Sequence, residues 1–213
     1  MADDATPRNK GGRPRKFERS QALERALELF WERGYEGASM ADLSAAMGMH
    51  SPSIYAAFGS KEELFREVTE QYERRFSAQL ADLLESAPTA SAAIAAFFRQ
   101  AIQTYTDSAR GCFFVLAAAT CSAGNDQVRA HLARKRGWVL RVIRERLERG
   151  CREGDLPADT DVEALAAYLV AVVQGISLQA RDGTPKEMLE AVAATALASL
   201  GRPPGQEKSG RAP

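Results

Sequence analysis

Apolar residues recur every three or four positions along most of the chain, the spacing that places side chains on one face of an α-helix. Alternation of apolar and polar residues, typical of strands, is absent, while Ala, Leu, Glu and Arg are abundant. The pattern therefore predicts an all-α protein. Its first helix is expected over residues 18–33, with Leu23, Leu27 and Phe30 on one face, and Gly34 at its end.

Two short helices are predicted next. Ser39 can cap a helix over residues 40–47, with Asp42 supplying a weak version of the capping box, and Gly48 ends it. His50 or Ser51 can cap the second short helix.

This second helix tolerates Pro52 in its first turn, because an N–H there has no helical partner to lose. Ile54 and Phe58 have the spacing of a buried face. The outer surface is left to Ser51, Pro52, Ser53 and Tyr55.

A long helix follows, because Ser60 and Glu63 form an S-x-x-E capping box ahead of an apolar pattern that runs to about Leu84. Two short helices joined by a Gly-containing turn and packed on a third form a helix-turn-helix, predicted over about residues 40–59. The second helix of such a motif can enter the DNA major groove. Residues 17–77 are therefore predicted to be a three-helix DNA-binding domain.

Residues 26–65, ALELFWERGYEGASMADLSAAMGMHSPSIYAAFGSKEELF, resemble the DNA-binding domain of the TetR/AcrR family of transcriptional regulators. The resemblance rests on a helix ending in F-x-x-x-G-Y, on a G-hydrophobic-x-x-x-S-hydrophobic-Y-x-x-F segment and on an S-K-E-x-L helix start. The resemblance implies that Ser39 and Met40 lie near phosphate and that Tyr55 and Lys61 hold the DNA backbone. It also implies a recognition helix over residues 50–55, with the DNA-contacting residues His50, Ser51, Pro52, Ser53 and Tyr55.

The recognition helix contains no Lys or Arg, so the bidentate contact of Arg with guanine is unavailable within it. Positive charge lies instead in the polar arm, residues 1–16, whose KGGRPRK segment includes Arg13, Arg15 and Lys16. We expect this arm to be disordered and to contact the minor groove, with a solubilising terminus as the alternative. The tail, residues 201–213, is also expected to be disordered.

Residues 78–200 are predicted to be helical, and they match the family's effector-binding and dimerisation part in length and pattern, with an R-G-C motif at residues 110–112. Their aromatic residues suggest a cavity for an apolar or aromatic effector, with packed aromatics as the alternative. The cavity residues are expected to be Phe97, Phe98, Tyr105, Phe114, Thr120, Trp138 and Gln174. The basic side of the helix over residues 126–153 is interpreted as a solvated face.

The last two helices are predicted to form a dimer interface, with a buried core helix as the alternative. Thr160 with Glu163 can cap one, and Pro185 is expected at the first position of the other. The segment ALAAYLVAVVQGISL is apolar around most of its circumference, which favours a four-helix contact between two copies. The expected interface residues are Leu169, Val173, Ile176, Leu189, Val192, Ala196 and Leu200.

Composition agrees with a folded protein of one large or two small domains. The 213 residues are 45% hydrophobic and 26% charged, with a net charge of zero. The start lacks an apolar signal region, and no run of about 18 uncharged apolar residues is apparent, so no membrane association is expected. Three cysteines without C-x-x-C spacing favour a reducing compartment, and we expect a cytoplasmic protein.

Motifs for other chemistry are weak. His50 and His131 belong to no catalytic or metal-binding motif, so neither enzymatic activity nor a cofactor or metal is expected. The sequence predicts a homodimeric transcriptional regulator, a repressor that binds a palindromic operator and is released by a small effector. Two alternatives remain: a redox or metal sensor on the same scaffold using Cys112 and Cys121, and a helical interaction protein without DNA binding.

Overall fold

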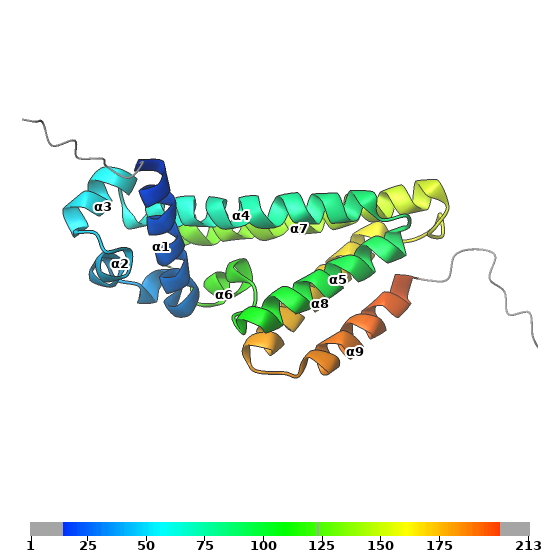
Figure 1. Cartoon of the computed structure of the whole chain (residues 1–213). Coiled ribbons are helices and arrows are strands. Elements are labelled where there is room, and N and C mark those ends of the chain that lie inside the picture. Colours follow the sequence, from blue (N-terminus) through cyan, green and yellow to red (C-terminus); the bar gives the residue numbers. More distant parts are fainter. Residues whose placement is uncertain (1–14, 123, 201–213) are drawn as a thin grey trace, which may run out of the picture.

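The computed structural model describes residues 15–122 and 124–200, and within them the secondary structure is entirely helical. Figure 1 shows three helices grouped at one end, two long helices running away from them, and a bundle at the other end. The predicted all-α fold is confirmed. The helices in chain order are α1 (Arg15–Gly37), α2 (Met40–Met47), α3 (Ser51–Phe58), α4 (Lys61–Ser86), α5 (Ala90–Ser108), α6 (Phe113–Ala119), α7 (Asp126–Glu153), α8 (Val162–Arg181) and α9 (Lys186–Leu197), followed by the short 3₁₀ helix η1 (Ala198–Leu200).

Helices α1, α2 and α3 form the head. The helical dihedral angles of α1 are interrupted at Gly34, where φ is 72° and ψ is 175°, at the predicted helix end. Ser39 caps α2 through a reciprocal capping box with Asp42, which is stronger than the sequence suggested. Gly48 adopts a left-handed conformation (φ 63°) in the turn between α2 and α3, a conformation that glycine adopts without steric cost.

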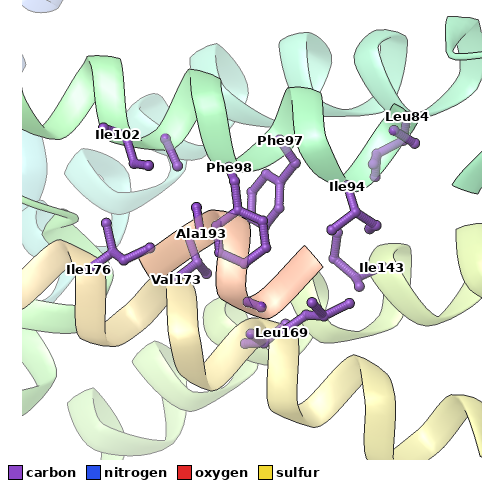
Figure 2. Packing of buried hydrophobic residues seen from close by; sticks show 14 of the residues in the cluster. Leu84, Ile94, Phe97, Phe98, Ile102, Ile143, Leu169, Val173, Ile176 and Ala193 are labelled. Carbon is purple, nitrogen blue, oxygen red and sulfur yellow. The ribbon is translucent and has the colours of Figure 1, made fainter. Parts of the chain in front are cut away.

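The helical body is built on α4 and α7, which pack along one another, and on α5, α8 and α9, which pack together beside them (Figure 1). The core of this bundle contains aromatic and aliphatic side chains from α5, α7 and α8 (Figure 2). Phe98, Ile102, Leu147, Leu169 and Ile176 are among its most buried members.

The head has a second core, and α6 belongs to it. Phe30, Leu43, Ile54 and Phe65 pack in one cluster with Phe113 and Phe114 of α6 and with Leu132 of α7. The core of the head therefore includes residues beyond the predicted domain boundary at residue 77. Because α6 and the start of α7 complete the close-packed core of the head, a displacement of either helix changes the packing of the head.

The turn before α6 explains the R-G-C motif. Gly111 has φ of 67°, and a Cβ atom there would lie 2.4 Å from the backbone oxygen of Ser177 on α8. The next residue, Cys112, donates its backbone N–H to the Ser177 hydroxyl at 2.7 Å. Glycine is thus required by both conformation and space where this turn meets α8.

Two predicted helix starts need correction. Asp161, not Thr160, caps α8, because its side chain accepts the backbone N–H of Ala164 at 3.0 Å. Pro185 is the N-cap of α9 and not its first helical residue.

The basic side of α7 is not wholly a solvated face. Lys135 forms a largely buried ion pair with Glu73 of α4. Arg136 donates to the backbone oxygen of Phe114 at 3.3 Å, and burial lowers the pKa of its guanidinium. These residues therefore join α7 to α4 and α6, while Arg129 and Arg134 remain exposed.

The expectation that no segment is apolar enough to span a bilayer also needs correction. Among the described helices, α8 alone is long and apolar enough to cross a membrane by length and composition, with a mean hydropathy of 1.5 over 18 residues. Core helices of folded proteins pass the same test, and α8 packs against α5, α7 and α9. Its apolar character is therefore accounted for by packing on one side and by an exposed apolar face on the other.

Candidate nucleic-acid interface and effector cavity

The outward face of α3 is polar and small. Ile54 and Phe58 are buried in the head, as predicted, while Pro52, Ser53 and Tyr55 are exposed. Tyr55 is 52% exposed and is one of the four large hydrophobic residues on the described surface. Pro52 stands in the first turn, as expected, and His50 precedes the helix as an N-cap whose side chain makes no capping bond. His50 is therefore free to contact another molecule.

The two helices that pack on α3, α2 and α4, both have capped starts. Ser39 accepts the backbone N–H of Asp42 at 3.1 Å, and Arg33 pairs with the Asp42 carboxylate at 2.9 Å. Hydrogen bonds from Ser39 hold the pKa of the Asp42 carboxyl below its usual range. Met40, in the first turn of α2, is half-buried. Helix N-termini carry partial positive charge and attract phosphate.

Lys61 is the first residue of α4, directly after the Ser60 cap. Its ammonium lies 4.6 Å from the centroid of the Tyr35 ring, a cation–π contact that aims the side chain. Burial lowers the pKa of this ammonium, and the nearby Glu36 carboxylate opposes the effect. Lys61 is thus a cation held in place at a helix N-terminus.

The basic arm is only partly within the described residues. Arg13 lies outside them. Arg15 and Lys16 belong by backbone to the first turn of α1, so the predicted arm is two residues shorter than residues 1–16.

A cavity of about 250 Å³ lies at the seam between the head and the body. Its walls come from α1, α4 and α5 and include five aromatic side chains: Trp31, Tyr72, Phe76, Phe97 and Tyr105. Charged and amide groups stand among them, including Glu24, Arg75 and Gln100. Mostly apolar walls with a few polar groups are typical of small-molecule sites.

A second, smaller cavity of about 30 Å³ shares Phe76, Phe97 and Tyr105 with the first. It extends toward α6, α7 and α8, where Phe114, Arg136 and Gln174 line it. Three aromatic side chains therefore stand between the seam cavity and the core of the body.

Of the seven predicted effector residues, four line these cavities: Phe97, Tyr105, Phe114 and Gln174. Trp138 does not line either, although its ring packs edge-on against Phe76 at 6.3 Å between centroids. Phe98 is buried in the core of the body, because it lies on the α5 face turned toward α8 and α9.

Thr120 was wrongly assigned to the cavity. It is exposed at the end of α6, where its hydroxyl donates to the Leu116 carbonyl at 3.2 Å, and it packs against Gly34 of the head. The residues that the sequence analysis missed are Trp31, Tyr72 and Phe76. The sequence analysis assigned no cavity residue to α1 or α4, because helical periodicity does not reveal which distant helices lie side by side.

The cysteines are free thiols, and Cys112 lies beside the smaller cavity. Burial raises the pKa of the Cys112 thiol, against the effect of hydrogen bonds from the backbone and from Tyr72 and Tyr105. Burial also raises the pKa of Cys121. Thiols with a raised pKa hold less thiolate and react more slowly. Among the described residues, no group of three His, Cys, Asp or Glu side chains is arranged to hold a metal ion.

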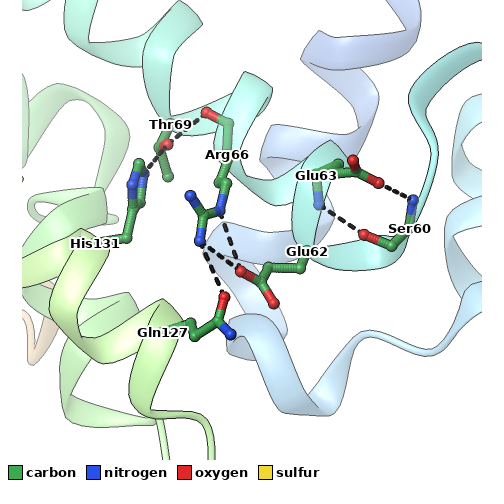
Figure 3. Close-up of polar contacts among 7 residues, drawn as sticks. All are labelled: Ser60, Glu62, Glu63, Arg66, Thr69, Gln127 and His131. Carbon is green, nitrogen blue, oxygen red and sulfur yellow. Dashed lines mark hydrogen bonds and ion pairs between the residues drawn. The ribbon is translucent and has the colours of Figure 1, made fainter.

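Polar contacts join the start of α4 to the start of α7. Thr69 and His131 meet inside the protein, and Arg66 donates to Glu62 and to Gln127 at 3.4 Å (Figure 3). In the same figure Ser60 and Glu63 form the capping box that starts α4.

The end of α1 is held in the same way. Glu36 accepts hydrogen bonds from the Ser122 backbone and from the Asn125 amide at 2.9 Å, and these bonds lower the pKa of its carboxyl.

The predicted dimer residues mostly face inward. Six of the seven are buried within this chain, with exposed fractions of 5% or less, so they are not available to a partner: Leu169, Val173, Ile176, Leu189, Ala196 and Leu200. Val192 is half-buried. The periodic residues fill the chain's own core because α5 and α7 cover that side of α8, and α5 covers α9.

The other side of α8 is nevertheless apolar. Tyr168, Leu178 and Met188 have exposed fractions of 43%, 48% and 58%. Between residues 164 and 180 the chain has no charged side chain, even though more than half of these positions are exposed or half-buried. Uncharged exposed helix faces of this kind mark protein–protein contacts.

These features define a helix-turn-helix DNA-binding protein. A three-helix head contains a short helix with an exposed polar face, this helix packs on two helices with capped N-termini, and the helical body meets the head at a cavity.

The chain belongs to the TetR family of transcriptional regulators. Residues 22–68 match the family model for "Bacterial regulatory proteins, tetR family", and residues 90–196 match that for "Tetracyclin repressor-like, C-terminal domain". The predicted family, and the expectation that the protein is a regulator of transcription and not an enzyme, are confirmed.

Similar proteins support this assignment over nearly the whole chain. The HTH-type transcriptional repressor ComR of Escherichia coli (strain K12) is 35% identical over 92% of this chain and 96% of its own length. The repressor BdcR of the same organism is 28% identical over 87% of this chain and 90% of its own length. A solved structure of the TetR family regulator CifR, a cysteine mutant complexed with 26 bp operator DNA, is 45% identical with a TM-score of 0.84 and covers 89% of this chain and 100% of the CifR chain.

Proposed function

We propose that the protein is a homodimeric repressor that binds a palindromic operator and is released by a compact apolar or aromatic effector. The observation that carries the proposal is the position of the seam cavity, whose walls include Trp31 of the head as well as Phe76 and Phe97 of the body. A ligand in that cavity contacts both parts. ComR and BdcR are named repressors, which supports this direction of control.

DNA is bound by the exposed face of α3 and the helix starts beside it. In this proposal His50, Ser53 and Tyr55 meet base edges and sugar-phosphate, Ser39 and Lys61 lie near phosphate, and the basic N-terminal arm follows the minor groove. Two heads of a dimer must reach half-sites roughly 34 Å apart or a multiple of this, which makes the operator palindromic.

Dimerisation uses the exposed apolar side of α8 and α9. Tyr168, Leu178 and Met188 provide the large side chains of this face. Ala171 and Gly175 stand between the first two, and a Cβ added at Gly175 would meet nothing within 4 Å, so another helix has room to approach closely. Two such helix pairs bury each other's apolar sides in a two-fold contact.

The effector acts by separating α1 from α4. Across this seam Glu24 is bound by Arg75 at 3.0 Å and by the amide of Gln71. A ligand that fills the cavity next to this pair favours a conformation in which the head is tilted. It lowers operator affinity only through its preference for that conformation, and a coupling of about 1–3 kcal/mol corresponds to about 5- to 150-fold.

The sensor alternative is less well supported. Burial raises the pKa of both Cys112 and Cys121, which disfavours thiolate chemistry and soft-metal binding without a rearrangement. Family membership favours DNA binding over the second alternative, a helical interaction protein.

The test begins with footprinting on the DNA that flanks the protein's own gene, followed by a thermal-shift screen of apolar and aromatic compounds. Trp31 lines the cavity and Trp138 is the only other tryptophan, so a Trp138→Phe variant reports ligand entry through Trp31 fluorescence alone. Linkage requires the operator to weaken ligand binding by the same factor by which the ligand weakens operator binding.

A plugged cavity provides the matched control. Thr104→Trp places a large ring at the cavity wall, whereas Arg99→Trp places the same ring on an exposed part of α5 outside it. We expect Thr104→Trp alone to abolish the ligand response while operator binding remains. A ligand whose affinity is indifferent to the operator contradicts the proposal, and stabilisation only by thiol oxidants, Cu(I) or Zn(II) supports the sensor alternative.

A further inference from the structure

Arg19, near the start of α1, contacts the end of the recognition helix. Its guanidinium Nη1 donates to the backbone oxygen of Ala57 at 2.7 Å, and its central carbon lies 4.2 Å from the centroid of the Phe58 ring. Carbonyl groups in the last turn of a helix lack helical partners and carry partial negative charge. The cation therefore satisfies and stabilises the C-terminal end of α3.

The same guanidinium is bound to α4. Its Nη2 donates to both carboxylate oxygens of Glu67, at 2.7 and 2.9 Å. One side chain thus joins three helices: α1 by its own backbone, α3 through Ala57 and Phe58, and α4 through Glu67. Because the charge is balanced by this carboxylate, Arg19 is engaged in the free protein and not waiting for a phosphate.

The recognition helix depends on such support. It has eight residues, about two turns, and only Ile54 and Phe58 of these are buried. Its N-cap residue His50 makes no side-chain capping bond. Short helices have little stability of their own, so contacts at the ends decide how the axis of α3 is held.

We propose that Arg19 is a positioning residue that sets the orientation of α3 on DNA, with Glu67 holding it from α4. The inference rests on DNA binding by the head and not on the effector. The pair also gives α4 a connection to α3, since α4 carries Glu67 near the head and Tyr72 and Phe76 in the cavity wall. A shift of α4 is therefore transmitted to the recognition helix.

The test compares two variants that each remove one cation from the head. Arg19→Gln breaks the contacts to α3. Arg33→Gln is the matched control, because Arg33 forms an equally exposed pair with Asp42 (side chains 45% and 35% exposed, against 41% and 36% for Arg19 and Glu67) but bonds to no residue of α3. Operator binding and binding to unrelated DNA are measured over a salt series, with thermal unfolding of each free protein.

We expect Arg19→Gln to weaken operator binding by at least about tenfold more than Arg33→Gln, and the two variants to share the same salt slope and the same affinity for unrelated DNA. A salt slope lower by about one per head for Arg19→Gln alone would identify a phosphate contact and overturn the proposal. Equal operator affinities of the two variants would also overturn it.

Glu67→Gln provides a second comparison and leaves the Arg19 cation in place. If Arg19 positions α3, this variant also loses operator affinity, because the guanidinium is no longer held. If Arg19 is a phosphate contact, removing the competing carboxylate leaves the affinity unchanged or raises it, which refutes the proposal. If Arg19→Gln does not fold, the operator affinity of Glu67→Gln tests the proposal by itself. Wild-type operator binding is the reference throughout, so a failed effector response leaves the test intact.

Discussion

The hydroxyl of Thr69 and Nε2 of His131 lie 2.6 Å apart inside the protein, where they join α4 to α7 (Figure 3). Thr69 also donates to the Arg66 carbonyl at 2.6 Å, so its oxygen serves as acceptor for a ring N–H. In this arrangement the Nε2–H of the imidazole donates to the Thr69 oxygen. The two helices that carry this pair also connect the head to the body.

Removal of the hydroxyl leaves the buried imidazole without this partner. We expect Thr69→Val to lower the free energy of unfolding by about 1–3 kcal/mol, the cost of an unsatisfied buried polar group. Thr104→Val is the control, because Thr104 is exposed. Urea denaturation of both variants measures the difference, and equal stabilities would show that the pair contributes nothing.

Stability is expected to fall in mild acid because of His131. Burial lowers the pKa of this imidazole, followed by repulsion from Lys135, Arg66 and Arg134, while Glu70 opposes the shift. A histidine whose pKa is lower in the folded state binds protons preferentially when unfolded, so stability is lost as the pH falls below the unfolded value of about 6.5.

The free energy of unfolding is measured by urea denaturation at about pH 7.5 and at about pH 5.5, above and below the unfolded-state pKa of histidine. Wild type should lose more stability over this interval than His131→Gln, which cannot take up the proton. A parallel decline of the two proteins would assign the acid sensitivity to other groups.

Gly111→Ala is expected to destabilise the protein by more than strain alone. Both Gly111 and Gly154 have positive φ, 67° and 80°, but an added Cβ would be 2.4 Å from the Ser177 oxygen at the first and would meet nothing within 4 Å at the second. Gly154→Ala should cost about 1 kcal/mol and Gly111→Ala several kcal/mol. Similar midpoints in thermal unfolding would show that the turn relaxes at little cost.

Charges on the two sides of α8 are expected to have different effects. Leu178→Arg adds a charge to the exposed apolar face, so the protein should remain folded but become monomeric and lose operator affinity. Val173→Glu buries an unpaired charge within the chain's own core and should unfold it, at a cost of several kcal/mol. Sedimentation with circular dichroism distinguishes the two, and a Leu178→Arg dimer would place the interface elsewhere.

Lys61→Ala should weaken binding to operator and unrelated DNA alike. A phosphate contact contributes about one unit to the salt slope in each head, so the slope should fall by that amount. His50 and Ser53 variants should instead change sequence preference at similar slope. Fluorescence anisotropy over a salt series makes the measurement, and an unchanged slope for Lys61→Ala would remove this residue from the interface.

Local sequence signals determined most of the head. Caps and stops act within a few residues, which is why Ser39 and Gly48 marked the limits of α2 correctly and Ser60 marked the start of α4. Helical periodicity also identified Ile54 and Phe58 as the buried side of α3. The family followed from the same short-range pattern.

Only the tertiary structure decided which apolar side of a helix meets which neighbour. Helix α8 is apolar nearly all round, so its sequence alone assigned Val173 to a partner, whereas α5 and α7 cover that side and leave Leu178 exposed. Contacts between distant residues are equally invisible to periodicity. Trp31 reaches the cavity because α1, α4 and α5 meet there, and Arg19 reaches Glu67, 48 positions away in the chain, because α1, α3 and α4 meet at the other end of the head. No local pattern encodes either contact.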